Sequence, residues 1–211
     1  MKSYLIRPAG ALVLALSLAS CGGGDDDKFT VEGYVSGLQY PGLVLQNNGQ
    51  DLPVAPPATA GETVKFVFPT KIDYGDTYKV TVKTQPAHQE CDVDENAPFS
   101  NADTAGRLSA IDVRMACAVQ KHYIGGTITG LTKDNTDLIL SNGTGGAFTP
   151  TTEALTAATP FKYVLDQVPY NVTYGVVVVK QPVGRFCTVS NAAGVMGDAD
   201  IDNINVNCVP V

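Results

Sequence analysis

The chain has 211 residues, 44% of them hydrophobic, and it contains no tryptophan. Its formal net charge is −7, from 14 basic and 21 acidic residues, and this acidic balance disfavours binding to nucleic acid. The length allows one or two domains, and the apolar content is ordinary for a globular chain.

The first twenty residues have the pattern of a signal peptide. Lys2 and Arg7 form a short positive region, and an apolar run follows from 11 to 18. This run is shorter than the roughly 20 apolar residues that a membrane-spanning helix needs, and it has the length of a signal-peptide core. Export would remove residues 1–20. Twelve basic and twenty-one acidic residues would then remain, a net charge of −9.

The stretch Leu18-Ala19-Ser20-Cys21 resembles the lipobox of bacterial lipoproteins. The resemblance implies that Cys21 becomes the N-terminal residue and carries two or three fatty chains, which is enough for stable membrane attachment. The alternative is plain secretion with an unmodified Cys21. After Cys21, three glycines, three aspartates and a lysine predict a flexible acidic tether, so that residues 21–28 form the anchor and its tether. By resemblance to sorted lipoproteins, Gly22 indicates a lipid-anchored location in the cell envelope, at the outer membrane.

The rest of the chain is a tandem repeat with an offset of 93 to 96 residues. Residues 31–38 (VEGYVSGL) parallel 124–131 (IGGTITGL), and 43–47 (LVLQN) parallel 138–142 (LILSN). Further pairs of equivalent positions are Phe66 with Phe161, Phe68 with Tyr163, Gln85 with Gln181, Cys91 with Cys187, and Cys117 with Cys208. The repeats span residues 29–117 and 122–211. The linker, residues 118–121, is too short for much bending.

Both repeats have the two-residue period of β-strands. Val64, Phe66 and Phe68 alternate with other residues, as inward-facing positions of a strand do. The continuous run 176–179 predicts a strand covered on both sides. Asn-Gly pairs at 48–49 and 142–143 predict turns, and no segment shows a helical stripe. We therefore expect an all-β protein with two tandem immunoglobulin-like antiparallel β-sandwich domains, each of six or seven strands in two sheets.

Four cysteines remain besides Cys21, and they allow three pairings. The equivalence of the repeats favours one bond in each repeat, Cys91–Cys117 and Cys187–Cys208. Each bond would tie the last strand to the strand or loop that follows the Gln-Pro pair. The chain has no Cys-x-x-Cys spacing, so the bonds are interpreted as structural.

The repeat resembles one found in lipoproteins and large surface proteins of Gram-negative bacteria. Its pattern runs Gly-x-Val-x-Gly-Leu, Leu-x-Leu-x-Asn, Phe-x-Phe, Tyr-x-Val-x-Val, Gln-Pro and two cysteines. The resemblance covers nearly all of the chain after residue 28. It implies the architecture and little about activity.

The strongest candidate for a ligand site lies in the second repeat, at Asp198, Asp200 and Asp202. Alternating aspartates begin calcium-binding loops, because this ion prefers several oxygen ligands. Asn203 and Val209, however, stand where such a loop has its glycine and glutamate. The alternative is a polar turn before the last strand. The acidic cluster Asp92, Asp94 and Glu95 is open to the same two interpretations.

Histidines, the commonest general bases, do not mark a repeated site. His88 aligns with Gly184 and His122 with Phe29, and His122 is expected to be solvated beside the linker. No nucleophile, phosphate-binding or zinc motif is present in the sequence.

These observations predict a non-enzymatic, membrane-anchored envelope lipoprotein that acts as a structural spacer or as a binding or adhesion module. Its expected partners are membrane lipid, through Cys21, and an envelope protein or glycan; no cofactor is expected. One alternative is a glycan-binding module that uses Tyr40, Tyr74 and Tyr170, although the equivalence of Tyr74 and Tyr170 favours a shared packing role. The other is an enzyme or calcium-binding protein with an unfamiliar site in the second repeat.

Overall fold

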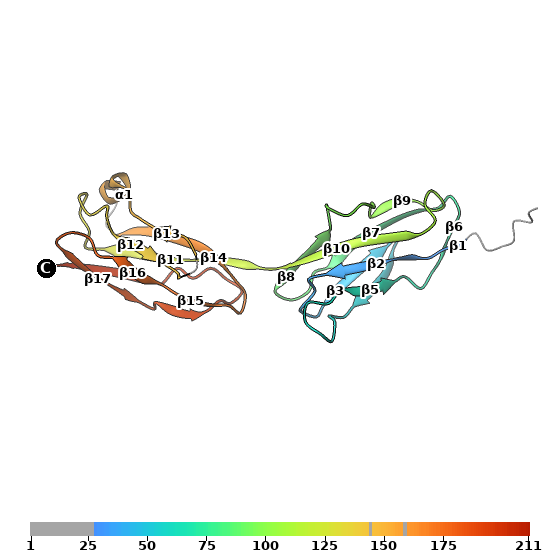
Figure 1. Cartoon of the computed structure of the whole chain (residues 1–211), viewed down its shortest axis with the longest axis horizontal. Coiled ribbons are helices and arrows are strands. Elements are labelled where there is room, and N and C mark those ends of the chain that lie inside the picture. Colours follow the sequence, from blue (N-terminus) through green and yellow to red (C-terminus); the bar gives the residue numbers. More distant parts are fainter. Residues whose placement is uncertain (1–27, 144, 158–159) are drawn as a thin grey trace, which may run out of the picture.

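The computed structural model describes residues 28–143, 145–157 and 160–211. This part of the chain is all-β apart from one six-residue helix. It forms two β-sandwich units, one at each end of a nearly continuous strand (Figure 1). Within the described residues, no helix has both the length and the apolar character required to cross a bilayer.

The first unit consists of ten strands: β1 (Lys28–Phe29), β2 (Val31–Ser36), β3 (Leu43–Asn47), β4 (Gln50–Val54), β5 (Val64–Val67), β6 (Ile72–Asp73), β7 (Thr77–Thr84), β8 (Gln89–Val93), β9 (Ala102–Thr104) and β10 (Ile111–Val119). One sheet has the order β5-β2-β10-β8 and the other β4-β3-β7-β9, with a separate pair β1-β6.

The second unit consists of β11 (Lys121–Thr129), β12 (Ile139–Ser141), β13 (Ala147–Phe148), α1 (Thr152–Ala157), β14 (Phe161–Pro169), β15 (Thr173–Gly175), β16 (Val177–Lys180), β17 (Arg185–Ser190), β18 (Ala193–Val195) and β19 (Asn205–Pro210). Its sheets are β14-β11-β19-β17 and β13-β12-β16, with a pair β15-β18. The four-stranded sheet repeats that of the first unit strand for strand. The second sheet differs because the long β7 has two short counterparts, β15 and β16.

Each unit has its own hydrophobic core, because the inward faces of its two sheets carry the apolar positions of the two-residue period. The first core is built on Val31, Val35, Leu43, Leu45, Phe66, Phe68, Val80, Val113 and Met115. The second is built on Ile124, Ile128, Leu138, Leu140, Phe161, Tyr163, Ile204 and Val206. Two separate clusters of buried side chains indicate two separately packed sandwiches.

The first and last long strands of each unit pair in parallel, which the expectation of purely antiparallel sheets missed. β2 pairs with β10, with Val31 opposite Ile111, and β11 pairs with β19, with Ile128 opposite Val206. Because both strands run in the same direction, the chain enters each unit at one end and leaves it at the other. This topology is what places the two units end to end (Figure 1).

Residues 118–121, predicted as the linker, are mostly strand. Ala118 and Val119 belong to β10 and pair with Glu90 and Gln89 of β8, while Lys121 pairs with Pro169 of β14. Only Gln120 lies between β10 and β11.

Two other expectations about local structure were wrong. The run 176–179 is not covered on both sides, since Val177 and Val179 are 53% and 61% exposed and only Val176 is fully buried. The short helix α1 was not expected, because six residues are too few to show a helical stripe. The Thr151 hydroxyl accepts a hydrogen bond from the Ala154 N–H at 3.2 Å and caps it, and Leu155 anchors it to the core.

Candidate functional site

The predicted lipidation residue, Cys21, lies outside the described residues. The described chain begins at Lys28, where β1 pairs with β6, and Lys28 Nζ lies 3.3 Å from a carboxylate oxygen of Asp73. The tether assigned to residues 21–28 would therefore join the first unit at the end away from the second unit (Figure 1).

The two disulfide bonds join the cysteines as the repeat predicts. Cys91 is bonded to Cys117 and Cys187 to Cys208, with Cα–Cα distances of 3.9 Å in both. Each pair lies directly opposite across antiparallel strands, β8 with β10 and β17 with β19. Each bond thus lies within one sheet, whereas the bond of immunoglobulin domains joins two sheets. It fixes the last strand of each unit against its neighbour.

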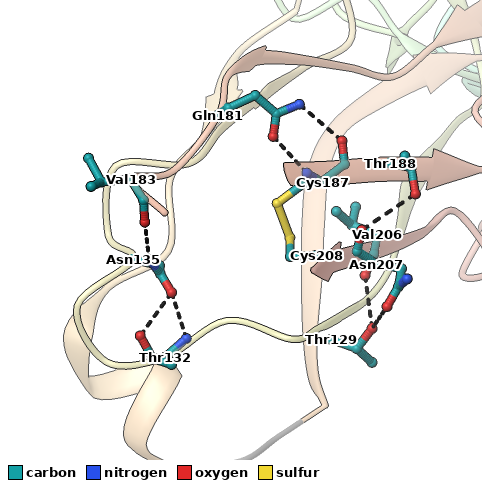
Figure 2. The surroundings of a disulfide bond; sticks show 10 residues. All are labelled: Thr129, Thr132, Asn135, Gln181, Val183, Cys187, Thr188, Val206, Asn207 and Cys208. Carbon is teal, nitrogen blue, oxygen red and sulfur yellow. Dashed lines mark hydrogen bonds between the residues drawn. A yellow bond between two sulfur atoms is a disulfide. The ribbon is translucent and has the colours of Figure 1, made fainter. Parts of the chain in front are cut away.

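The glutamine of the Gln-Pro pair holds the first cysteine of each bond. The Gln181 amide accepts a hydrogen bond from the Cys187 N–H at 2.7 Å and donates one to the Cys187 carbonyl at 3.0 Å (Figure 2). In the first unit, Gln85 makes the same two bonds with Cys91, at 2.7 and 2.8 Å. A side-chain amide satisfies one backbone donor and one acceptor here. The conserved geometry explains why both repeats carry this glutamine.

The glycines of the Gly-x-Val-x-Gly-Leu pattern are required by close contacts between strands. A Cβ atom on Gly33 would overlap the Val113 carbonyl oxygen, and one on Gly126 would overlap that of Ile204. Gly37 and Gly130 have φ values of 71° and 76°, and a Cβ on either would overlap the carbonyl oxygen of the second cysteine. Left-handed backbone and close approach both favour glycine.

The asparagine that ends Leu-x-Leu-x-Asn also has the same role in both units. The Asn47 side-chain amide oxygen accepts a hydrogen bond from the Lys79 N–H at 3.0 Å, and the Asn142 side-chain amide oxygen accepts one from the Gly175 N–H at 2.8 Å. Lys79 and Gly175 occupy equivalent positions of the repeat. The repeated polar residues therefore satisfy backbone groups and do not converge on a shared cleft.

The three candidate metal ligands do not converge on one point. A carboxylate oxygen of Asp198 lies 2.5 Å from His88 Nδ1, and Asp200 accepts a hydrogen bond from the Tyr123 N–H at 2.8 Å. Asp202 lines a cavity beside β11. Within the described ranges, no group of three or more His, Cys, Asp or Glu side chains is placed to hold a metal ion. Side chains of the stretch 198–202 instead contact neighbouring residues of the protein.

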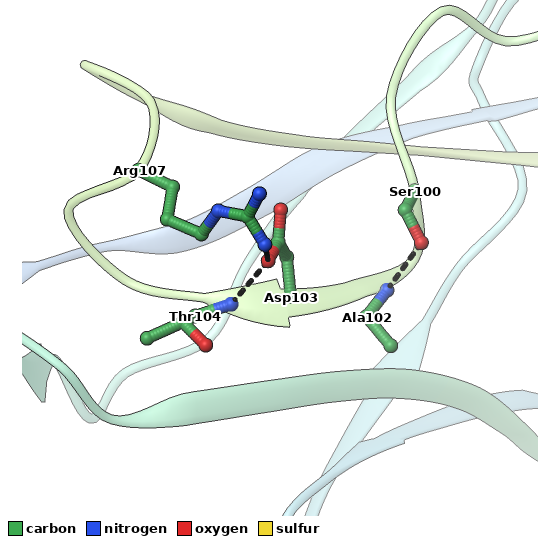
Figure 3. Close-up of polar contacts among 5 residues, drawn as sticks. All are labelled: Ser100, Ala102, Asp103, Thr104 and Arg107. Atoms are coloured by element: carbon green, nitrogen blue, oxygen red, sulfur yellow. Dashed lines mark hydrogen bonds and ion pairs between the residues drawn. The ribbon is translucent and has the colours of Figure 1, made fainter.

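Acidic side chains of the first unit are also held by local contacts. The Asp103 carboxylate accepts hydrogen bonds from the Thr104 N–H at 2.7 Å and from the Arg107 guanidinium at 3.1 Å, on strand β9 (Figure 3). In the acidic cluster before it, Asp92 and Asp94 accept from the N–H groups of Val93 and Asn96. Each of these carboxylates accepts a hydrogen bond from a backbone N–H one or two residues further along the chain.

The main apolar cavity lies in the second unit, at the end that faces the first. It has a volume of about 400 Å³ and is lined by Tyr123, Ile124, Gly125, Gly126, Lys162, Tyr163, Val164, Asp200, Ile201 and Asp202. Its walls come from β11 and β14, at the point where their pairing shifts register between Tyr123 and Gly125. Its lining contains no histidine, serine or cysteine, and its ionisable side chains are those of Tyr123, Lys162, Tyr163, Asp200 and Asp202.

Tyr163 is the one strongly perturbed titratable group beside this cavity. Burial raises the pKa of its hydroxyl from about 10 to about 12. The hydroxyl donates a hydrogen bond to the Ile204 carbonyl at 2.8 Å. Tyr163 therefore stays neutral at physiological pH and serves to tie β14 to the stretch before β19.

Sequence reasoning missed the contact between the two units. His88 and Tyr40 of the first unit meet Tyr170 and Asp198 of the second. One sequence feature could have indicated this contact: His88 departs from the repeat, which has Gly184 at the equivalent position. His122, expected to be solvated, is only 21% exposed, and its Nδ1 lies 3.8 Å from Asp200.

Comparison with known proteins does not add to this description, because neither a protein-family model nor a curated protein matches the chain.

Proposed function

We propose that this protein is a lipid-anchored lipoprotein of the bacterial cell envelope, attached through Cys21 at the outer membrane. In this role it would act without catalysis, as a spacer or as a module that binds an envelope protein or glycan. The proposal of a non-catalytic role rests on the hydrogen bonds that the repeated polar residues make. Gln85, Gln181, Asn47 and Asn142 are all engaged with backbone groups of their own unit.

The topology supports a spacer. The chain enters the first unit at Lys28 and runs through both units in one direction, so an anchor placed before Lys28 would leave the second unit farthest from the membrane (Figure 1). An acidic chain would also be repelled by anionic headgroups, which favours a folded part held away from the lipid surface.

Fractionation of cells that express the full chain tests the anchor. The wild-type protein is expected in the membrane fraction, and Cys21→Ser is expected in the soluble periplasmic or secreted fraction, because it lacks the thiol that carries lipid. Ser20→Ala is the matched control, since it keeps a small residue beside Cys21 and should remain in the membrane. A soluble wild-type protein, or a Cys21→Ser variant that stays membrane-bound, would contradict the proposal.

Crosslinking in intact cells tests the binding role. We expect the anchored protein to form a reproducible crosslink with an envelope protein or glycan, and Cys21→Ser to lose it. If no partner is captured and the purified protein turns over an envelope substrate, the non-enzymatic role is wrong.

A specific surface favours glycan as the partner class for the second unit. Thr127 and Thr129 on β11 donate hydrogen bonds to Asn205 and Asn207 on β19, at 2.8 and 3.0 Å, on the outward face of the four-stranded sheet. Figure 2 shows the pair Thr129 and Asn207. Rows of hydroxyl and amide groups match the alternating donors and acceptors of neutral sugars. Titration with neutral envelope polysaccharide should show binding that weakens at least tenfold, about 1.4 kcal/mol, in Asn205→Ala/Asn207→Ala and not in Ser36→Ala on the same face of the first unit. Equal binding by both variants would exclude this surface.

A further inference from the structure

The single residue between the two units is fixed from both sides. The Gln120 N–H donates to the His88 carbonyl of the first unit at 2.9 Å, and the Gln120 carbonyl accepts from the Tyr170 N–H of the second unit at 2.9 Å. Strand β10 precedes Gln120 and β11 follows it. The place where a hinge would be expected is therefore tied by backbone hydrogen bonds to both sandwiches.

Side chains of both units pack against each other beside Gln120. The His88 imidazole stacks on the Tyr170 ring, with centroids 3.7 Å apart and planes inclined by 4°. Tyr40 meets both rings edge-on, at centroid distances of 5.2 Å from His88 and 5.7 Å from Tyr170. Stacked and edge-to-face pairs are the favourable geometries for aromatic rings. Three rings thus form one cluster across the junction.

A polar contact completes the cluster. His88 Nδ1 lies 2.5 Å from a carboxylate oxygen of Asp198, with the two side chains 27% and 57% exposed. Asp200, two residues on, is held to β11 through the Tyr123 N–H. The loop that presents Asp198 is therefore itself anchored to the strand that leads out of the junction.

The backbone at His88 indicates that this side chain is placed for the junction. His88 has a φ of 57°, in the left-handed region that disfavours residues with a Cβ atom. The equivalent Gly184 has a φ of 69°, so the fold requires a left-handed residue at this position in both units. Where glycine would relieve the strain, the first unit instead carries the side chain that reaches the second unit. Strained backbone at a contact of this kind points to a function for the contact.

We propose that Tyr40, His88, Tyr170 and Asp198 form a latch that holds the two units as one rigid arm. The second unit lacks the equivalent side chains at its own far end, where Gly184 and Lys133 align with His88 and Tyr40. The latch is thus specific to the junction and is not a general feature of the repeat. It holds whether or not the chain is lipidated.

Residual dipolar couplings of the exported chain carrying Cys21→Ser test the latch separately from the anchor. We expect couplings from both units to fit one common alignment tensor. In His88→Gly the backbone conformation is eased while all latch contacts of the imidazole are lost, so the units should keep their folds but fit two different tensors. Asn48→Gly is the matched control: its φ is 47°, and it follows the end of β3 away from Tyr40. It should retain the common tensor.

Two outcomes would overturn the proposal. One is a wild-type chain whose units already align independently. The other is a His88→Gly variant whose units share one tensor with the wild-type relative orientation. Amide spectra of each variant show whether each unit remains folded, so a loss of the common tensor is assigned to the junction only when both sets of resonances are unchanged.

Discussion

The two units place apolar side chains at equivalent inward positions and differ on the outward face of the same sheet. In the first unit, the Arg114 guanidinium lies 4.5 Å from the centre of the Tyr34 ring, and its charge is balanced by Asp112 at 2.5 Å. In the second unit, the equivalent cross-strand positions hold Asn205 and Thr127, joined by a hydrogen bond of 2.8 Å. The backbone register is the same in both. The residues that the fold requires are repeated in both units. The residues that face solvent or a partner have diverged.

The largest effect is expected at a repeated glycine. Gly33→Ala should destabilise the first unit by more than about 3 kcal/mol, because the new methyl group would force the parallel strands β2 and β10 apart. Gly126→Ala should do the same to the second unit. Calorimetry should show one unit melting early while the other is unchanged.

Gly175→Ala is the matched control for these substitutions. A Cβ atom there has no heavy atom within 4 Å, so the stability should change by no more than about 0.5 kcal/mol. If Gly33→Ala is equally mild, the close approach of β2 and β10 does not explain the repeated glycine.

Substitution of either repeated glutamine is expected to cause a smaller loss of stability, equal in the two units. Gln85→Ala and Gln181→Ala each remove two hydrogen bonds to a cysteine backbone, and each should cost its own unit about 1–2 kcal/mol. Urea unfolding of the two variants measures this cost. Gln46→Ala, on an exposed side-chain pair, serves as the control. If the two variants lose unequal amounts of unfolding free energy, the same hydrogen-bond geometry does not contribute the same stability in both units.

A pH-dependent difference is expected at a position where the inward residues themselves differ. Tyr163 of the second unit aligns with Phe68 of the first, and burial raises the pKa of Tyr163 to about 12. A tyrosine with a raised pKa stabilises the fold below its unfolded value near 10, and this contribution disappears as the pH rises from about 10 to about 12. The second unit of the wild type should lose stability over this range because of Tyr163.

Tyr163→Phe should abolish that alkaline loss, at a cost of about 1 kcal/mol near neutral pH from the missing bond to Ile204. Denaturant melts at several pH values measure both effects. A variant that still loses the same stability between pH 10 and 12 would assign the titration to another group.

The smallest effect is expected from exchanging the outward pair. Tyr34→Thr/Arg114→Asn gives the first unit the pair of the second, and its stability should change by less than about 1 kcal/mol, because both pairs lie on the outward face and remain partly accessible to solvent. A larger loss in calorimetry would show that the outward face of the first unit supports its fold.

Much of the fold follows from local sequence patterns. The alternation around Phe66 and the equivalence of the cysteines predicted the all-β sandwiches and the two disulfide bonds. The parallel pairing of β2 with β10 could not be predicted in the same way, because it depends on how strands about 80 residues apart are arranged in the sheet. The exposure of Val177 and Val179 likewise depends on which face of the sheet remains uncovered.

The contact at the junction could not be predicted from the sequence for a related reason. His88 and Asp198 are 110 residues apart, and no local pattern connects them. The alignment of His88 with Gly184 marked the position as exceptional, but only the left-handed backbone shows why the exception matters. A residue that departs from a repeat is therefore informative about function where its backbone conformation is unfavourable for that residue.

The most direct test of the proposed anchor is mass spectrometry of the N-terminal peptide from protein purified out of membranes. The expected result is a peptide that begins at Cys21 and carries the mass of a diacylglycerol, with or without a further acyl chain. A peptide that begins elsewhere, or an unmodified Cys21 in membrane-derived protein, would contradict the lipoprotein assignment.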